Sequence, residues 1–270
     1  MKVRANGITM NYELVSEGDC LVLVHGAGDN LRMWYEQTPV FSKRYRVLTY
    51  DVRGFGETEC PDTEVSVSLL ATDLRELLRT LGVDRAFVLG YSMGGRIALQ
   101  LALDEPSMAR ALIMANSGVG LGPRPPGADE RRRRLIETLE RSDLETVSEH
   151  MTASSFSPGL KERNAALFER YKEIKLANDP RFFARVWGMV MQSPPPDVSR
   201  LSRLACPVLI VAGDNDAFMS LESARLTQAA IPGSRLEVLP SGHAAALEAP
   251  DDFNRVILDF LEQARGADNP

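Results

Sequence analysis

Short apolar runs recur along the chain and constrain its fold more than any other feature. They occupy residues 21–24, 47–50, 86–89, 111–114, 208–212 and 236–239. Each run is rich in Val, Leu or Ile and shows no strict polar alternation, which indicates strands buried on both faces of a parallel sheet. Helical patterns lie between them, at 68–81, 94–103, 221–230 and 251–263. This alternation predicts an α/β fold with a mostly parallel central sheet flanked by helices.

The first of these helical patterns also predicts which side chains face solvent. Its leucines fall near one face of the helix, and Gly82 follows as a C-terminal stop. The polar residues of the same segment are expected away from that face: Asp73, Arg75, Glu76 and Arg79.

The stretch from Ser117 to about Pro196 departs from this alternation. A Gly/Pro-rich segment at 118–127 leads into polar, amphipathic helical patterns, and three prolines at 194–196 close the region. We therefore predict an α/β core of residues 1–117 and 197–270 and a helical cap (lid) insertion of residues 118–196. The alternative is that these helices only cover a sheet edge. Acidic residues flank the basic run 131–134, which favours a solvated helix face over an anion-binding patch.

Length and composition exclude several classes of protein. The 270 residues suffice for one large domain or two small ones, and 44% apolar with 25% charged residues is typical of soluble globular proteins. A net charge of −6 argues against a nucleic-acid partner. Three cysteines without a spacing pattern fit a reducing compartment. No signal-peptide pattern or membrane-spanning run is visible, so we predict a cytoplasmic protein without membrane contact.

The sharpest motif is Gly90-Tyr91-Ser92-Met93-Gly94, which lies directly between an apolar run and a helical pattern. A serine in such a strand–turn–helix adopts a strained backbone conformation that exposes its hydroxyl. The glycines two positions to either side let strand and helix approach each other closely. Ser92 is therefore the predicted nucleophile.

A serine hydroxyl needs a general base, and the chain holds only three histidines. His243 follows the run 236–239, and parallel sheets place their sites beyond the carboxyl ends of strands. We therefore predict His243 as the base. His150 is expected on the surface, and His25 is expected to fix its own loop.

The base in turn needs a carboxylate that holds its tautomer and stabilises the imidazolium. The run 208–212 leads into Gly213-Asp214-Asn215-Asp216. Asp216 is the predicted partner because it lies further along the loop, and Asp214 is the alternative. The order Ser92, Asp216, His243 is that of nucleophile-elbow hydrolases.

An oxyanion formed at the nucleophile needs two hydrogen-bond donors. The backbone N–H of Met93, directly after Ser92, is the first candidate. The loop after an early strand should supply the second, and the sequence His25-Gly26-Ala27-Gly28 offers the N–H of Ala27.

Taken together, these motifs resemble the α/β-hydrolase family. The matching pieces are His25-Gly26, the segment 51–56, the segment 90–95, the segment 213–216, and Gly242-His243 with the segment 247–250. Thr58 stands where the family usually has serine. The resemblance covers nearly the whole chain outside the insertion and implies the serine-nucleophile branch, because related dehalogenases and epoxide hydrolases carry aspartate at the elbow.

Within the family, the leading hypothesis is a hydrolase of small carboxylic esters or lactones that acts through an acyl-enzyme. The segments 112–117 and 156–159 are similar to enol-lactonases that act on oxoadipate-type lactones. One alternative is a carbon–carbon bond hydrolase of the meta-cleavage-product type, which usually carries asparagine where this chain has Tyr91.

Two further alternatives remain. The elbow also resembles that of the menaquinone-pathway synthase, a lyase in which Arg96 would help to bind a carboxylate. A structural ion pair is the more common role for an arginine at this position. The other alternative is a small-molecule receptor that retains the three site residues but turns over slowly or not at all.

The substrate pocket is predicted only from position. Trp34, Tyr91 and Trp187 are candidates to line an apolar pocket, together with Phe182, Phe183 and Met191 from the insertion. The sequence shows no metal-ligand spacing and no dinucleotide fingerprint, so we predict no metal and no cofactor. The expected partner is a small-molecule substrate, and both a monomer and a homodimer remain open.

Overall fold

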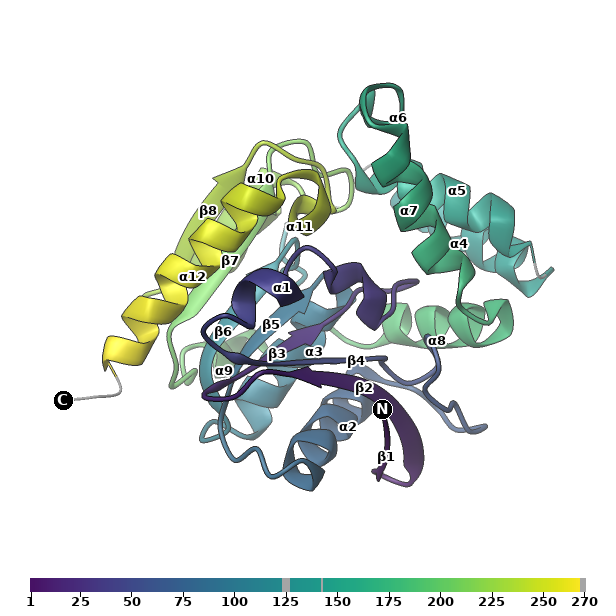
Figure 1. The fold of residues 1–270 in the computed structure, drawn as a ribbon. Coiled ribbons are helices and arrows are strands. Elements are labelled where there is room, and N and C mark those ends of the chain that lie inside the picture. The colour runs from purple at the N-terminus through teal and green to yellow at the C-terminus, as the bar shows by residue number, and fades with distance from the viewer. Residues whose placement is uncertain (123–126, 142, 268–270) are drawn as a thin grey trace.

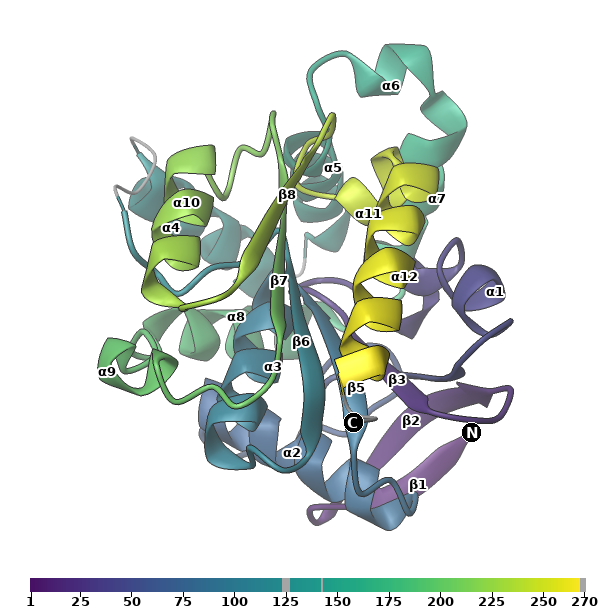
Figure 2. The ribbon, with the colours of Figure 1, turned by 90° about the vertical axis from the view of Figure 1, so that its left-hand side faces the viewer.

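A central sheet with helices on both faces organises the chain (Figures 1 and 2). The computed structural model describes residues 1–122, 127–141 and 143–267. Within these residues, eight strands form one sheet in the order β1-β2-β4-β3-β5-β6-β7-β8. The strands are β1 (Lys2–Ala5), β2 (Ile8–Val15), β3 (Cys20–Val24), β4 (Arg46–Tyr50), β5 (Ala86–Tyr91), β6 (Ala109–Ala115), β7 (Val208–Gly213) and β8 (Arg235–Leu239).

The six predicted strands are confirmed as β3 to β8, and every pairing among them is parallel. β1 and β2 were not predicted from the sequence. These strands add an antiparallel edge, in which β1 pairs with β2 and β2 pairs with β4. The prediction of burial on both faces was wrong for β8, where the side chain of Val238 is 45% exposed. Because β8 pairs only with β7, it forms the opposite edge of the sheet and meets solvent.

Helices cover the two faces of the sheet (Figure 2). Helices α2 (Val67–Thr80), α3 (Met93–Asp104) and α10 (Leu221–Ala230) lie on one face. Helices α1 (Thr38–Phe41) and α12 (Pro250–Ala267) lie on the other. Successive strand residues alternate between two apolar clusters, so that Val22 packs with α2 and α3 whereas Leu23 packs with α1 and α12. The shorter elements are η1 (Leu31–Trp34), α9 (Val198–Leu201) and α11 (Ala245–Glu248).

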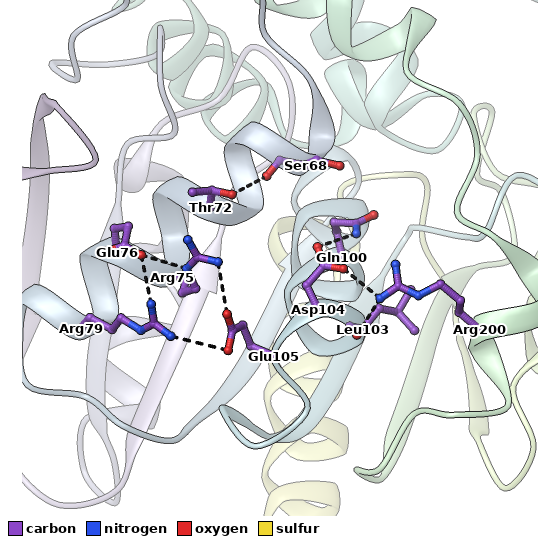
Figure 3. A network of polar contacts seen from close by, with 10 residues as sticks. All are labelled: Ser68, Thr72, Arg75, Glu76, Arg79, Gln100, Leu103, Asp104, Glu105 and Arg200. Atoms are coloured by element: carbon purple, nitrogen blue, oxygen red, sulfur yellow. Dashed lines mark hydrogen bonds and ion pairs between the residues drawn. The ribbon is translucent and has the colours of Figure 1, made fainter.

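The four predicted helices agree with α2, α3, α10 and α12 to within a few residues. The solvated face of α2 carries ion pairs that were not predicted, since Arg75 and Arg79 both reach Glu105 at the end of α3 (Figure 3). The prediction that Asp73 faces solvent was wrong, because its side chain is buried. It accepts two hydrogen bonds from the guanidinium of the buried Arg53, at 2.6 and 2.7 Å, and this bidentate pair compensates the burial of both charges.

The helical insertion separates β6 from β7 in the sequence, and in Figure 1 its helices α4 to α7 lie above the carboxyl ends of the parallel strands. Its helices are α4 (Ala128–Glu140), α5 (Leu144–Ser155), α6 (Leu160–Arg163), α7 (Ala165–Leu176) and α8 (Pro180–Gln192). Residues 123–126 of the predicted Gly/Pro stretch lie outside the described residues. Of the basic run, Arg133 and Arg134 are exposed and pair with Glu130, while the side chains of Arg131 and Arg132 are not described.

No helix in the described part of the chain combines the length and the apolar character needed to cross a bilayer.

Candidate active site

The turn between β5 and α3 presents Ser92 in a strained conformation. Its φ of +54° and ψ of −116° lie outside the regions that an L-residue ordinarily adopts. The N–H of Ser92 donates to the carbonyl of Ala115 on β6 at 2.9 Å, and the carbonyl of Ser92 accepts from the N–H of Gly95 at 3.0 Å. These two bonds hold the turn on both sides.

Glycine is required on each side of this turn because backbones approach each other directly. A Cβ atom at Gly90 would lie 2.2 Å from the carbonyl oxygen of Gly94. A Cβ atom at Gly94 would lie 2.2 Å from the carbonyl oxygen of Val24 on β3. Neither distance is sterically possible, so this spacing of glycines is what lets α3 begin directly against the sheet.

Ser92, His243 and Asp216 form one continuous chain of hydrogen bonds. His243 Nε2 lies 2.9 Å from Ser92 Oγ, and His243 Nδ1 lies 2.8 and 2.9 Å from the two carboxylate oxygens of Asp216. The loops after β5, β7 and β8 supply the three residues. A neutral imidazole that donates from Nδ1 to the carboxylate and accepts at Nε2 from the hydroxyl satisfies all three contacts.

The Asp216 carboxylate is fully buried and yet held in its charged form. Burial alone would raise the pKa of this carboxyl, but attraction to the His243 ring and the hydrogen bonds it accepts hold the pKa below its ordinary value. The N–H groups of Phe218 and Met219 donate to Oδ1 at 2.8 and 2.9 Å. Asp214 lies instead in the exposed turn, where its Oδ1 accepts from the N–H of Ser241 at 3.1 Å.

Asn116 also contacts this carboxylate, which the sequence analysis missed. It follows β6, and its Nδ2 donates to Asp216 Oδ2 at 3.0 Å and to the carbonyl of Gly242 at 3.3 Å. Its φ of +48° turns the chain sharply after the strand. Asn116 thereby joins the loop of Asp216 to the loop of His243. Its position just past a parallel strand was the signal that could have identified it.

Glu248 joins the loop of His243 to the helical insertion, and this role also was not predicted. Its Oε2 accepts from the N–H of Gly242 at 2.8 Å and from the N–H of Ser157, just after α5, at 3.0 Å. The Ser157 hydroxyl donates to the other carboxylate oxygen. The N–H of Ala244 also donates to the carbonyl of Ser155, at the end of α5, at 2.7 Å. These contacts therefore join the segment around His243 to the end of α5.

The loop 25–30 follows β3 and lies beside the turn that carries Ser92, because Val24 pairs with Gly90 in the sheet. The N–H groups of Ala27 and Met93 donate to no acceptor among the residues that the structure describes. Both N–H groups are therefore free to donate to a ligand.

His25 fixes the start of this loop. Its Nδ1 donates to the carbonyl of Gly26 at 2.8 Å, and its Nε2 accepts from the N–H of Val52 at 2.9 Å. The second contact requires the neutral ring, because a protonated Nε2 cannot accept a hydrogen bond. Burial lowers the pKa of His25 and outweighs the opposing attraction of the Asp51 carboxylate.

His25 should make the free energy of unfolding depend on pH. A histidine in the unfolded chain titrates near its ordinary value of 6.5, so below that pH the unfolded state binds a proton that the folded state does not. Stability contributed by the neutral ring is present above this pH and falls by about 1.4 kcal/mol per pH unit below it, until the folded-state pKa is reached. We expect the difference in unfolding free energy between the parent and His25→Asn to narrow from pH 7 to pH 5 in urea titrations. If the difference between the two proteins stayed the same from pH 7 to pH 5, the prediction would be contradicted.

The predicted pocket residues lie at different depths. Trp34 is fully buried in the apolar cluster on the face of α1 and α12. The Tyr91 ring lies 5.2 Å from the His243 ring, and the Trp187 ring lies 5.7 Å from that of Phe183. Phe218 was not predicted, although its ring lies 4.7 Å from His243 and is 43% exposed. The Met191 side chain lies outside the described part, and His150 is exposed as expected.

Among the residues that the structure describes, Arg96 forms none of the ion pairs considered more common for its position. Its guanidinium donates to the backbone carbonyls of Val190, Ser193 and Pro194, each at 3.3 Å. These carbonyls lie at the end of α8 and just after it, where the C-terminus of a helix carries partial negative charge. Arg96 thus ties the insertion to α3.

The fold and this site together define a hydrolase built on an open α/β sheet, and comparisons with known proteins agree. The α/β hydrolase fold profile matches residues 19–250. The 3-oxoadipate enol-lactonase 2 of Acinetobacter baylyi is 27% identical over 256 residues, which cover 94% of this chain and 93% of that protein. The 2-hydroxy-6-oxononadienedioate/2-hydroxy-6-oxononatrienedioate hydrolase 2 of Pseudomonas putida is 30% identical over 275 residues, covering 94% and 92%.

A solved structure of a thermophilic esterase from Thermogutta terrifontis superposes with a TM-score of 0.88 at 26% identity, covering 98% of each chain. The chain therefore belongs to the α/β-hydrolase fold family. It is a hydrolytic enzyme of that family, and the resemblance noted in the sequence is confirmed.

Proposed function

We propose that the protein is a serine hydrolase that cleaves a small carboxylic ester or lactone through an acyl-enzyme. The observation that carries this proposal is the unbroken chain of hydrogen bonds from Ser92 through His243 to Asp216 at a strained turn. Similarity to an enol-lactonase and to an esterase supports the choice of bond. The proposed setting is the cytoplasm, with a small molecule as partner and no cofactor.

In the proposed reaction, Ser92 Oγ attacks the substrate carbonyl carbon while its proton passes to His243 Nε2. The N–H groups of Ala27 and Met93 donate to the resulting oxyanion. As the tetrahedral intermediate collapses, the carbon–oxygen bond to the leaving group breaks, and His243 gives its proton to that oxygen. Water then repeats the sequence on the acyl-enzyme and frees Ser92. Asp216 keeps the proton on Nδ1 and stabilises the imidazolium.

One alternative has specific support. The Pseudomonas putida relative is 30% identical to this chain, against 27% for the enol-lactonase, and its name identifies it as a hydrolase of 2-hydroxy-6-oxononadienedioate. This supports a carbon–carbon bond hydrolase as the second candidate. The lyase candidate is weaker, because the Arg96 guanidinium already donates to three carbonyls of the insertion.

Steady-state hydrolysis of p-nitrophenyl esters from acetate to octanoate, with γ- and δ-lactones followed by pH-stat, tests the proposal. We expect many turnovers per enzyme, saturation with substrate and a preference for short to medium acyl chains. A single burst equal to the enzyme concentration would contradict it and favour a receptor. Inactivity on all esters and lactones, with cleavage of a vinylogous diketone, would favour the carbon–carbon bond hydrolase.

A further inference from the structure

The loop 25–30, which carries Ala27, is held by the helical insertion as well as by the sheet. Three side-chain hydrogen bonds join it to the C-terminal half of α7 and the residues just after. Asn30 Nδ2 donates to the carbonyl of Ile174 at 2.7 Å, and Asn178 Nδ2 donates to the carbonyl of Gly28 at 2.9 Å. Lys175 Nζ donates to Asp29 Oδ1 at 2.6 Å. The loop is therefore fixed between two parts of the chain that lie far apart in sequence.

The contact between Lys175 and Asp29 differs from the other two because it buries two charges. Both side chains are 1% exposed. Lysine and aspartate are rarely buried to this extent, and burial is tolerated only when the charges are paired closely. The Lys175 ammonium also lies 4.0 Å from the centre of the Tyr171 ring, which offers it the negative face of an aromatic. The pair therefore has one well-defined geometry.

The loop has little freedom to move away from this geometry. Gly28 has a φ of +78°, and a Cβ atom there would lie 2.5 Å from the ring of Phe183 on α8. The ring of Phe183 thus packs directly on the backbone of Gly28, which lies between Ala27 and Asp29. On the opposite side, the His25 ring fixes the start of the loop.

We propose that Lys175 is a positioning residue, which by holding Asp29 fixes the N–H of Ala27 where the substrate oxyanion forms. The inference rests on the proposed function, since it assigns Ala27 as an oxyanion donor. Donors act on the transition state only if they are already in place when charge develops, so a loop displaced by a fraction of an ångström loses rate rather than substrate affinity. The insertion then contributes to catalysis itself and not only to covering the site.

The test compares the double variant Lys175→Met/Asp29→Asn with Lys172→Met. The double variant keeps the shapes of both side chains and removes both buried charges together, so no unpaired charge remains in the interior. Lys172 lies on the same helix and forms ion pairs with Glu145, Glu149 and Glu169 at the surface. Its replacement deletes the same ammonium group without touching the loop.

Three readouts separate positioning from a general structural effect. We expect kcat of the double variant to fall tenfold or more while KM stays within twofold of the parent. We expect the inhibition constant of phenylboronic acid, whose boron becomes tetrahedral on adding Ser92 Oγ, to rise by a similar factor. Amide hydrogen exchange of the segment 26–30 should become faster. Lys172→Met should match the parent in all three.

A double variant with parent values of kcat, boronic acid inhibition and exchange overturns the proposal. A rise in KM by the same factor as the fall in kcat, with slow exchange of the loop retained, also overturns the proposal. If the double variant does not melt cooperatively, Lys175→Met/Asp29→Leu, which also leaves no buried charge and no unpaired polar group at this pair, carries the same expectations. A parent that hydrolyses no ester contradicts the proposed function, and the exchange measurement then still decides whether Lys175 positions the loop.

Discussion

Replacement of Ser92 by alanine is expected to lower kcat for ester hydrolysis by roughly 10⁴- to 10⁶-fold. Without Oγ no acyl-enzyme can form, and His243 has no hydroxyl proton to accept. The remaining rate would come from water that binds where Oγ lay and from the oxyanion donors. The measurement is kcat on the best p-nitrophenyl ester of the series, with the release of p-nitrophenolate followed by its absorbance.

Ser148→Ala is the matched control for this replacement. Ser148 lies on α5, and its buried hydroxyl has no hydrogen-bond partner among the residues that the structure describes. Its loss should leave kcat unchanged. Thermal melting should show that both variants stay folded. Activity retained by Ser92→Ala would assign the nucleophile elsewhere.

The second large effect is expected for Asp216→Asn, which should lower kcat on the order of 10⁴-fold. The amide can present its NH₂ group to His243 Nδ1, which then must accept, and the ring proton moves to Nε2. In that tautomer the ring can no longer accept the proton of Ser92 Oγ. The imidazolium formed during the reaction also loses the negative charge that stabilises it.

Asp214→Asn provides a control two residues away in the same turn. Its side chain accepts from the backbone of Ser241 and from the neighbouring Asn215, and an amide oxygen can replace the carboxylate oxygen in both contacts. We expect a less than tenfold change in kcat. If Asp214→Asn proved the more damaging variant, the assignment of the carboxylate would have to be exchanged.

The sequence predicted the buried centre of the sheet well because burial leaves a local pattern. The run at β3 is apolar at every position since helices cover both of its faces. β2 was missed although Ile8, Met10 and Tyr12 alternate with polar residues, because only continuous apolar runs were taken as strands. β8 was predicted as a strand but not as an edge, since strand order depends on pairings that no local pattern contains.

The same distinction applies to the candidate site. Ser92, Asp216 and His243 could be predicted because each directly follows a recognisable strand. The buried pairs could not be. Asp73 lies at a helix position that the pattern predicts to be solvated, and it is buried because Arg53, twenty residues earlier, and Asn6 both donate to it. Lys175 lies in an amphipathic helix and meets Asp29 across 146 positions of sequence.

The buried contacts of the insertion have a consequence for exchanging parts between related enzymes. Substituting the residues 118–196 of this chain with helices of a homologue that carries other residues at these two positions would remove the side chains of Lys175 and Ser157 together. Asp29 would then be left as an uncompensated interior charge, a defect of about 3–5 kcal/mol. Glu248 would lose the hydroxyl donor of Ser157 at the same time. A working chimera therefore has to carry residues 29 and 248 along with the transplanted helices. The unit that can be exchanged includes these two residues of the core, because they contact the insertion although they lie far from it in the sequence.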